Sequence, residues 1–217
     1  MSTNYSHSMY QRLLERNITL PDEKKFSNEG EFPLPHIPEL TIKAIVLGAD
    51  PTNPSEKRIE YVFDLYPDES LRNRGYSWII ENNLKSIGLS WHHVYVQNLC
   101  KNYFNGVTSI EKENWLKAAE VWVGDLREEL DSIQKIPSHI PILATTYYIV
   151  KALVTPPNHY KEPKIYYGND YKNFVPLPPD NCMLNRPLIP FYRSTSYYLG
   201  NNKRNGYRDY IAQLIKE

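Results

Sequence analysis

The apolar run from Leu40 to Leu47, which ends at Gly48, is the feature that most constrains the fold of this chain. It is mostly apolar, rich in β-branched residues, and followed by the turn Ala49-Asp50-Pro51. A short run of this kind, closed by glycine and proline, is typical of a strand that is buried inside a sheet. We therefore expect a strand over residues 40–47 with a loop at its carboxyl end.

The remainder of the chain alternates between helical and strand patterns. Apolar residues at helical spacing predict helices over residues 5–17, 77–87, 111–133, 147–153 and 206–216. Further strands are expected at 94–98, 141–145 and 188–191, and loops at 21–38 and 155–183, with a hairpin around Gly168-Asn169 in the second loop. This alternation predicts an α/β fold, a three-layer α/β/α arrangement around a mainly parallel four-stranded sheet. We expect one domain over residues 1–217, with residues 1–40 as an N-terminal extension.

Composition excludes several classes of protein. The chain has 217 residues, of which 41% are hydrophobic, and no stretch approaches the roughly 20 apolar residues of a membrane span. The N-terminus has no apolar signal-peptide core, so we expect a cytoplasmic protein. Two cysteines cannot supply a disulfide framework or an iron–sulfur cluster, and the six histidines lack metal-ligand spacing. With no P-loop or dinucleotide motif either, we expect no metal, no cofactor and no membrane partner.

Charge is unevenly distributed although the net charge is zero. From Thr145 onward there are ten Lys/Arg and five Asp/Glu, and residues 184–208 contain five basic residues and no acid. Such a stretch marks either a phosphate-facing surface or an ordinary solvated face, and charge alone leaves both open. Sites in parallel sheets form at the carboxyl ends of strands. The candidate loops are therefore Gly48–Pro54, Asn98–Gly106 and Phe191–Gly200.

The order and content of these loops resemble the uracil-DNA glycosylase superfamily. The first motif is Gly48-Ala-Asp-Pro51, the second is Val94-Tyr-Val-Gln-Asn-Leu-Cys-Lys101, and the third is Pro190-Phe-Tyr-Arg-Ser-Thr195. The resemblance covers roughly residues 40–215 and implies a uracil-DNA glycosylase-like fold. It also implies removal of uracil or a related damaged base from DNA, with single- or double-stranded DNA as the partner. We expect the protein to be a monomer.

The resemblance assigns roles residue by residue. Asp50 would position or activate the hydrolytic water, and Phe63, thirteen residues further on, would stack on the flipped base. Asn98 would read the uracil edge, and Gly48 and Ala49 would line the base pocket. Arg193 stands where the family has its catalytic His, and Thr52 stands where one branch has a Tyr that excludes thymine. DNA contacts are expected from Ser194, Thr195, Lys203 and Arg204.

Each role has an alternative in ordinary structure. Asp50 could cap a turn, Phe63 could belong to the core, and Asn98 could be a turn residue. Arg193 could stabilise the leaving base anion, but a guanidinium is no general acid near neutral pH, and it could equally contact a phosphate. An inactive relative that binds nucleic acid or a nucleobase is therefore a second hypothesis. An unrelated small-molecule hydrolase is a third, favoured if Asp50 and Asn98 face different pockets.

Overall fold

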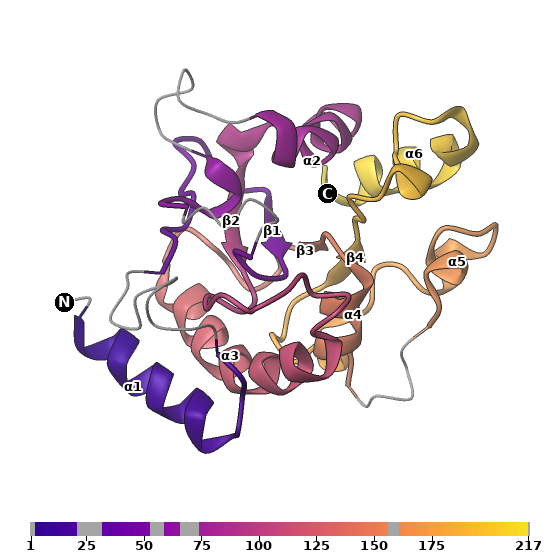
Figure 1. Cartoon of the computed structure of the whole chain (residues 1–217). Coiled ribbons are helices and arrows are strands. Elements are labelled where there is room, and N and C mark those ends of the chain that lie inside the picture. The colour runs from indigo at the N-terminus through magenta and orange to yellow at the C-terminus, as the bar shows by residue number, and fades with distance from the viewer. Residues whose placement is uncertain (1–2, 21–31, 53–58, 66–73, 156–160, 217) are drawn as a thin grey trace.

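Four parallel strands form the centre of the molecule (Figure 1). The computed structural model describes residues 3–20, 32–52, 59–65, 74–155 and 161–216. The strands lie in the order β2-β1-β3-β4, and all of their residues are buried. They span β1 Ala44–Gly48, β2 Val94–Asn98, β3 Ile142–Ala144 and β4 Leu188–Pro190. The expected parallel sheet of four strands is confirmed.

Helices cover both faces of this sheet. Figure 1 shows α2 and α6 on one side of the strands, and α3 and α4 on the other. The helices span α1 Thr3–Glu15, α2 Arg74–Ser86, α3 Lys112–Ser132, α4 Tyr147–Leu153, α5 Pro163–Tyr166 and α6 Asn205–Leu214. This is the expected three-layer α/β/α arrangement. No helix within the described ranges is both long and apolar enough to cross a membrane.

The register of the strands brings their carboxyl ends to one edge. Gly48, the last residue of β1, is paired with Asn98, the last residue of β2. On the other side of β1, Leu47 is paired with Ala144 at the end of β3. The loops that follow β1, β2, β3 and β4 therefore lie next to one another, as the candidate site requires.

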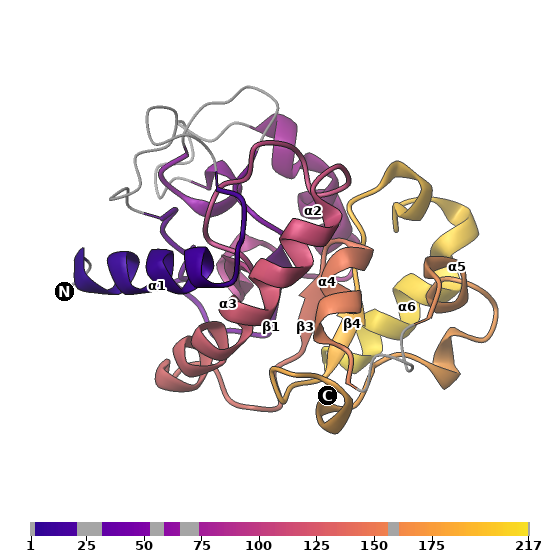
Figure 2. The same cartoon turned by 60° about the horizontal axis from the view of Figure 1, so that its bottom comes forward.

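The N-terminal extension packs on both the helical layer and the sheet edge. Figure 2 shows α1 against α3, where Arg12 forms an ion pair with Asp125 at 3.1 Å. Further along, the His36 N–H donates to the Val96 carbonyl at 3.0 Å, and the Val96 N–H donates back to His36 at the same distance. The expected loop over residues 21–38 therefore ends alongside β2, whereas residues 21–31 lie outside the described ranges.

Two local expectations are corrected. The first strand begins at Ala44 rather than Leu40, because the N–H groups of Leu40 and Lys43 donate to the short turn His92-His93 instead of a strand, and Leu40 is 53% exposed. The hairpin expected around Gly168 does not form, because Gly168 lies in the turns between helix α5, which spans Pro163–Tyr166, and a short 3-10 helix at Tyr171–Asn173. Proline suits the first turn of a helix because its missing N–H has no helical partner there.

Candidate functional site

The carboxylate of Asp50 lies just beyond β1 and is buried, with 5% of the residue exposed. Its Oδ1 accepts a hydrogen bond from the Thr52 N–H at 3.0 Å, and its Oδ2 accepts one from the Thr108 hydroxyl at 2.7 Å. Burial raises the pKa of Asp50, and the hydrogen bonds from Thr108 and Thr52 and the charge of Arg193 oppose this only in part. A buried acid with a shifted pKa is a candidate for acid–base chemistry.

Backbone hydrogen bonds hold the Asp50 loop against the loop that follows β2. The N–H of Leu99 donates to the Gly48 carbonyl at 2.8 Å, and the N–H of Cys100 donates to the Ala49 carbonyl at 2.9 Å. These bonds continue the pairing of β1 with β2 past the ends of both strands. The position of the Asp50 side chain is therefore set by the sheet and not by its own loop alone.

Gly48, Phe63 and Asn98 meet directly behind this loop. A Cβ on Gly48 would lie 2.2 Å from Asn98 Oδ1 and 2.6 Å from the Phe63 ring, so only glycine fits. Phe63 has φ 59°, a left-handed conformation that costs a residue other than glycine about 1–3 kcal/mol. Asn98 is 1% exposed, and its Oδ1 accepts no hydrogen bond from the described residues. Strain and an unsatisfied buried acceptor at one place make this cluster a candidate for binding.

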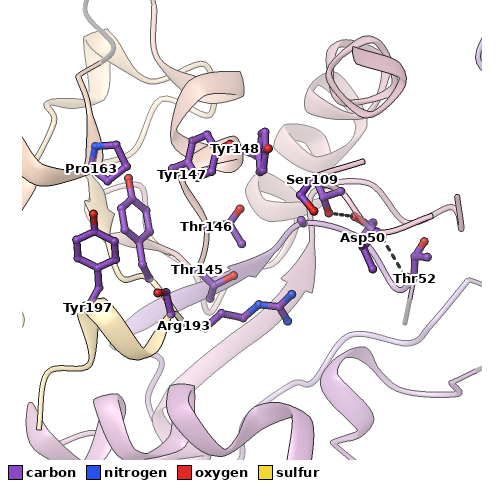
Figure 3. Close-up of a pocket in the computed structure, with 15 residues that line it drawn as sticks. Asp50, Thr52, Ser109, Thr145, Thr146, Tyr147, Tyr148, Pro163, Arg193 and Tyr197 are labelled. Carbon is purple, nitrogen blue, oxygen red and sulfur yellow. Dashed lines mark hydrogen bonds between the residues drawn. The ribbon is translucent and has the colours of Figure 1, made fainter. Parts of the chain in front are cut away.

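A cavity of about 690 Å³ lies beside Asp50 (Figure 3). Pockets that hold small ligands measure roughly 300–1,000 Å³. The lining comes from the segments that follow all four strands: Ala49, Asp50, Thr52, Val107, Thr108, Ser109, Thr145, Thr146, Tyr147, Tyr148, Pro163, Tyr192, Arg193, Ser194 and Tyr197. Gly48, Phe63 and Asn98 are outside this lining. The structure thus separates an open cavity from a closed cluster behind it.

Arg193 shares the cavity with Asp50. Its N–H donates to the Thr145 carbonyl at 3.0 Å, which attaches the segment after β4 to the end of β3. In Figure 3 the guanidinium extends past Thr145 toward the side of the cavity where Asp50 lies. Its charge lowers the pKa of Asp50, although less than burial raises it. The Asp50 carboxylate and the Arg193 guanidinium therefore line the same cavity.

The basic stretch does not form one surface. Arg186 is buried, with 1% exposed, and donates hydrogen bonds to the Pro137 carbonyl and to Asp131. Arg208 forms an ion pair with Asp209 at 2.9 Å. The basic residues between 184 and 208 therefore lie partly in the interior and partly on the surface. For Arg186, neither a phosphate-facing surface nor a solvated face is correct.

The four residues assigned to DNA contact are scattered as well. Ser194 is exposed and lines the cavity, and Thr195 begins the exposed turn that follows it. Lys203 is exposed on a separate turn. Arg204 stacks over Tyr167, with 5.7 Å from its guanidinium carbon to the ring centroid, and donates to the Tyr167 carbonyl at 2.7 Å. Of these four, only Ser194 borders the cavity.

Sequence reasoning missed two parts of the site. Thr108 lies 58 residues after Asp50, and nothing in its neighbourhood marks it as the donor to that carboxylate. Tyr147 and Tyr148, at the start of α4, form an aromatic wall of the cavity together with Pro163 and Tyr197. The unusual count of 18 tyrosines was the available signal for this wall, but it did not point to particular positions.

This arrangement contains the groups that hydrolysis at a carbon developing positive charge would require. Asp50 can accept a proton from water and stabilise that charge, and Arg193 can stabilise a leaving anion. No three His, Cys, Asp or Glu side chains in the described part of the chain are grouped so as to hold a metal ion. In comparisons with known proteins, no family model and no curated protein matches this chain. The roles of these residues therefore rest on geometry and on the motifs.

Proposed function

We propose that this protein is a DNA glycosylase, similar to the uracil-DNA glycosylase superfamily, that removes uracil or a related damaged base. The observation that carries the proposal is that Asp50 and Arg193, from the first and third motifs, line one cavity at the carboxyl edge of the sheet. The second motif contributes Asn98, which contacts Gly48 directly behind that cavity. Three loops that are far apart in sequence thus meet at one place. We place the enzyme in the cytoplasm, acting on DNA as a monomer.

The proposed reaction is a single displacement by water. Water attacks C1′ of the nucleotide and gives its proton to the Asp50 carboxylate, while the bond from C1′ to the base nitrogen breaks. The base leaves with the electron pair of that bond, and the Arg193 guanidinium stabilises the resulting anion until solvent protonates it. The Asp50 charge also stabilises the positive sugar in the transition state. The products are the free base and an abasic site.

The closed cluster is the proposed base-binding site. A pyrimidine edge offers an N–H donor next to a carbonyl acceptor, and the Asn98 side-chain amide can both accept and donate. The unsatisfied Asn98 Oδ1 would gain the donor that it lacks, and the Phe63 ring would stack on the base. Because Phe63 and Asn98 are 2% and 1% exposed, the contact over Gly48 must open for the base to enter. Extrusion of the base from its stack costs a few kcal/mol in addition.

An oligonucleotide with a single uracil tests the proposal. Wild-type protein should leave an abasic site that alkali cleaves, and Asp50→Asn should reduce the rate by roughly 10²- to 10⁴-fold, the contribution of a general base. Asparagine keeps an acceptor for the Thr52 N–H, so the variant should fold normally, as circular dichroism can verify. Absence of cleavage across uracil, hypoxanthine and other damaged bases would sink the proposal.

The alternative is a protein that binds nucleic acid or a nucleobase without cleaving it. Arg193 in the place of a His favours this alternative, because a guanidinium cannot donate a proton to the leaving base near neutral pH. It predicts oligonucleotide binding that weakens steeply with salt and yields no abasic product. Arg193→Ala should weaken that binding. Unchanged binding would remove Arg193 from this alternative.

A further inference from the structure

The cavity has two chemically different ends. Figure 3 shows Asp50, Thr52 and Ser109 on one side, and Pro163 and Tyr197 on the opposite side, with Thr145, Thr146 and Arg193 between them. Tyr147 and Tyr148 lie along the same wall between the two sides. The proposed chemistry uses only the end with Asp50. The remaining part, formed by Tyr147, Tyr148, Pro163 and Tyr197 and called the aromatic end below, has no part in breaking the glycosidic bond.

The rings of the aromatic end pack against other aromatic rings. The Tyr147 and Tyr148 rings lie 3.9 Å apart between centroids, and Tyr148 packs against the buried Trp115 at 6.3 Å. On the other side, the Tyr197 ring lies 4.6 Å from that of Tyr167. Tyr147 is nonetheless 37% exposed. Aromatic rings that are packed on one side and partly exposed on the other are suited to stacking with another flat ring.

On the basis of the proposed function, we propose that this aromatic end stacks a second, unpaired nucleobase next to the one removed, so that the substrate is single-stranded DNA. In a duplex each base is stacked on its neighbours and paired, and its face is not accessible. In a single strand the neighbouring base can turn onto the tyrosines, and such stacking tolerates any base.

The middle of the cavity fits the phosphate between the two nucleosides. Arg193 provides a guanidinium there, and Ser194 and Thr146 provide hydroxyl groups. The Thr146 hydroxyl oxygen is buried and has no hydrogen-bond partner among the described residues. Arginine and hydroxyl side chains are common partners of DNA phosphates. One linking phosphate would therefore meet the Arg193 guanidinium and the Ser194 hydroxyl, and the buried Thr146 hydroxyl would reach it only after a rotation.

The basic stretch also favours a single strand. Duplex binding depends on many phosphate contacts by Lys and Arg. In this stretch Arg186 is buried, Arg204 is bonded to the Tyr167 carbonyl, and Arg208 is paired with Asp209. Arg186, Arg204 and Arg208 are thus engaged within the protein. A short single strand that is held by stacking has less need of them.

Binding to uncut oligonucleotides tests the stacking site. In an Asp50→Asn background, fluorescence anisotropy would compare two labelled pentadeoxynucleotides with central uracil, one flanked by thymines and one by abasic analogues. Tyr147→Ala should weaken binding of the thymine-flanked pentamer by about 5- to 150-fold and leave the abasic-flanked one unchanged. Tyr147→Phe should retain affinity. Trp78→Ala is the matched control, because Trp78 is 52% exposed and outside the cavity lining.

Equal affinity of the Asp50→Asn protein for the two pentamers would overturn the inference. An equal loss of affinity for both pentamers after Tyr147→Ala would also overturn it. The same loss on a duplex with this sequence would overturn the preference for a single strand. These outcomes are distinct from failure of the proposed function, because the binding assay requires no cleavage. Excision of uracil without dependence on the flanking base refutes the stacking site alone. Dependence on the flanking base without excision supports it and refutes the glycosylase.

Discussion

Asp50 is a buried carboxylate and Glu129 is a largely buried one, and the two have opposite surroundings. Glu129 lies on α3, and its oxygens accept hydrogen bonds from the Tyr95 hydroxyl, the Gln97 amide and the Lys101 ammonium. Its side chain is 21% exposed, and that of Lys101 is 11% exposed. The oxygens of Asp50 accept hydrogen bonds from neutral donors, among them the Thr52 N–H and the Thr108 hydroxyl. Arg193 acts on Asp50 from across the cavity.

The difference shows how a partner decides the role of a buried acid. Burial raises the pKa of both carboxyl groups, but Lys101, with the hydrogen bonds from Tyr95 and Gln97, brings the pKa of Glu129 below its ordinary value. For Asp50 the effect of burial prevails, and its pKa is raised. Glu129, whose charge is neutralised by Lys101, connects α3 to the loop after β2. An incompletely neutralised acid beside a cavity is available for chemistry.

Among the variants that test this comparison, Lys101→Met should have the largest effect on stability. It leaves Glu129 buried without its cation, and loss of one partner of a buried pair costs about 3–5 kcal/mol. The free energy of unfolding from urea titration should fall by that amount, whereas excision per folded molecule should not change. Lys101 belongs to the second motif by sequence, so an equal loss of excision in the folded fraction would show that it acts in the site.

Arg127→Met is the matched control for this prediction. Arg127 also pairs with a carboxylate, that of Asp131 at 3.9 Å, but both side chains are more than half exposed. Exposed pairs contribute about 0–1 kcal/mol because water and salt screen them. The control should therefore unfold almost like the wild type. If it lost as much stability as Lys101→Met, burial would not be the reason for the larger effect.

Most of the fold could be predicted from hydrophobic periodicity. The run that ends at Gly48 is apolar because β1 is the second of four strands and is covered on both faces. The helix over residues 112–132 was predicted within one residue at each end because Trp115, Trp122 and Leu126 all face the core. The segment over 161–183 could not be predicted, because tertiary contacts hold it. Its Tyr167 hydroxyl, for example, donates to the Pro190 carbonyl of β4.

The candidate site could be predicted only in part. The ends of β1 and β2 were identifiable because Gly48 and Asn98 interrupt apolar runs, and register then places them side by side. The burial of Arg186 could not be predicted, since charge patterns do not show whether a side chain turns inward. The Thr108–Asp50 hydrogen bond joins two loops over 58 residues and depends on their final packing. No local pattern encodes such a contact.

Thr108→Val should sharpen the comparison through the pH dependence of excision. Valine has no hydroxyl to stabilise the ionised Asp50, so the pKa of Asp50 should rise further. Excision requires the carboxylate, and its acidic limb should therefore move to higher pH. Loss of a hydrogen bond to a charged group costs about 1.5–3 kcal/mol, or roughly tenfold or more in rate on that limb. Thr108→Ser keeps the donor and should keep the profile. A uniform loss at all pH values would contradict the assignment.

The smallest expected effect is the change in the free energy of unfolding when each acid is replaced by its amide. This change has opposite signs at Asp50 and at Glu129. The pKa of Asp50 is raised in the folded chain, so the stability that it contributes is present at low pH and is lost as pH rises through that pKa. At pH 7 the folded protein carries a buried charge at a cost, and Asp50→Asn should increase the free energy of unfolding by about 0.5–2 kcal/mol. The gain should vanish at a pH low enough to protonate Asp50 in both the folded and the unfolded chain.

Glu129→Gln should instead destabilise the protein at pH 7. The pKa of Glu129 is lowered in the folded chain, so its charge stabilises the fold at pH 7, and this stabilisation is lost as pH falls through that pKa. Destabilisation by both variants in thermal or urea unfolding at pH 7 would mean that Asp50 is as well neutralised as Glu129, and that the cavity holds a structural acid.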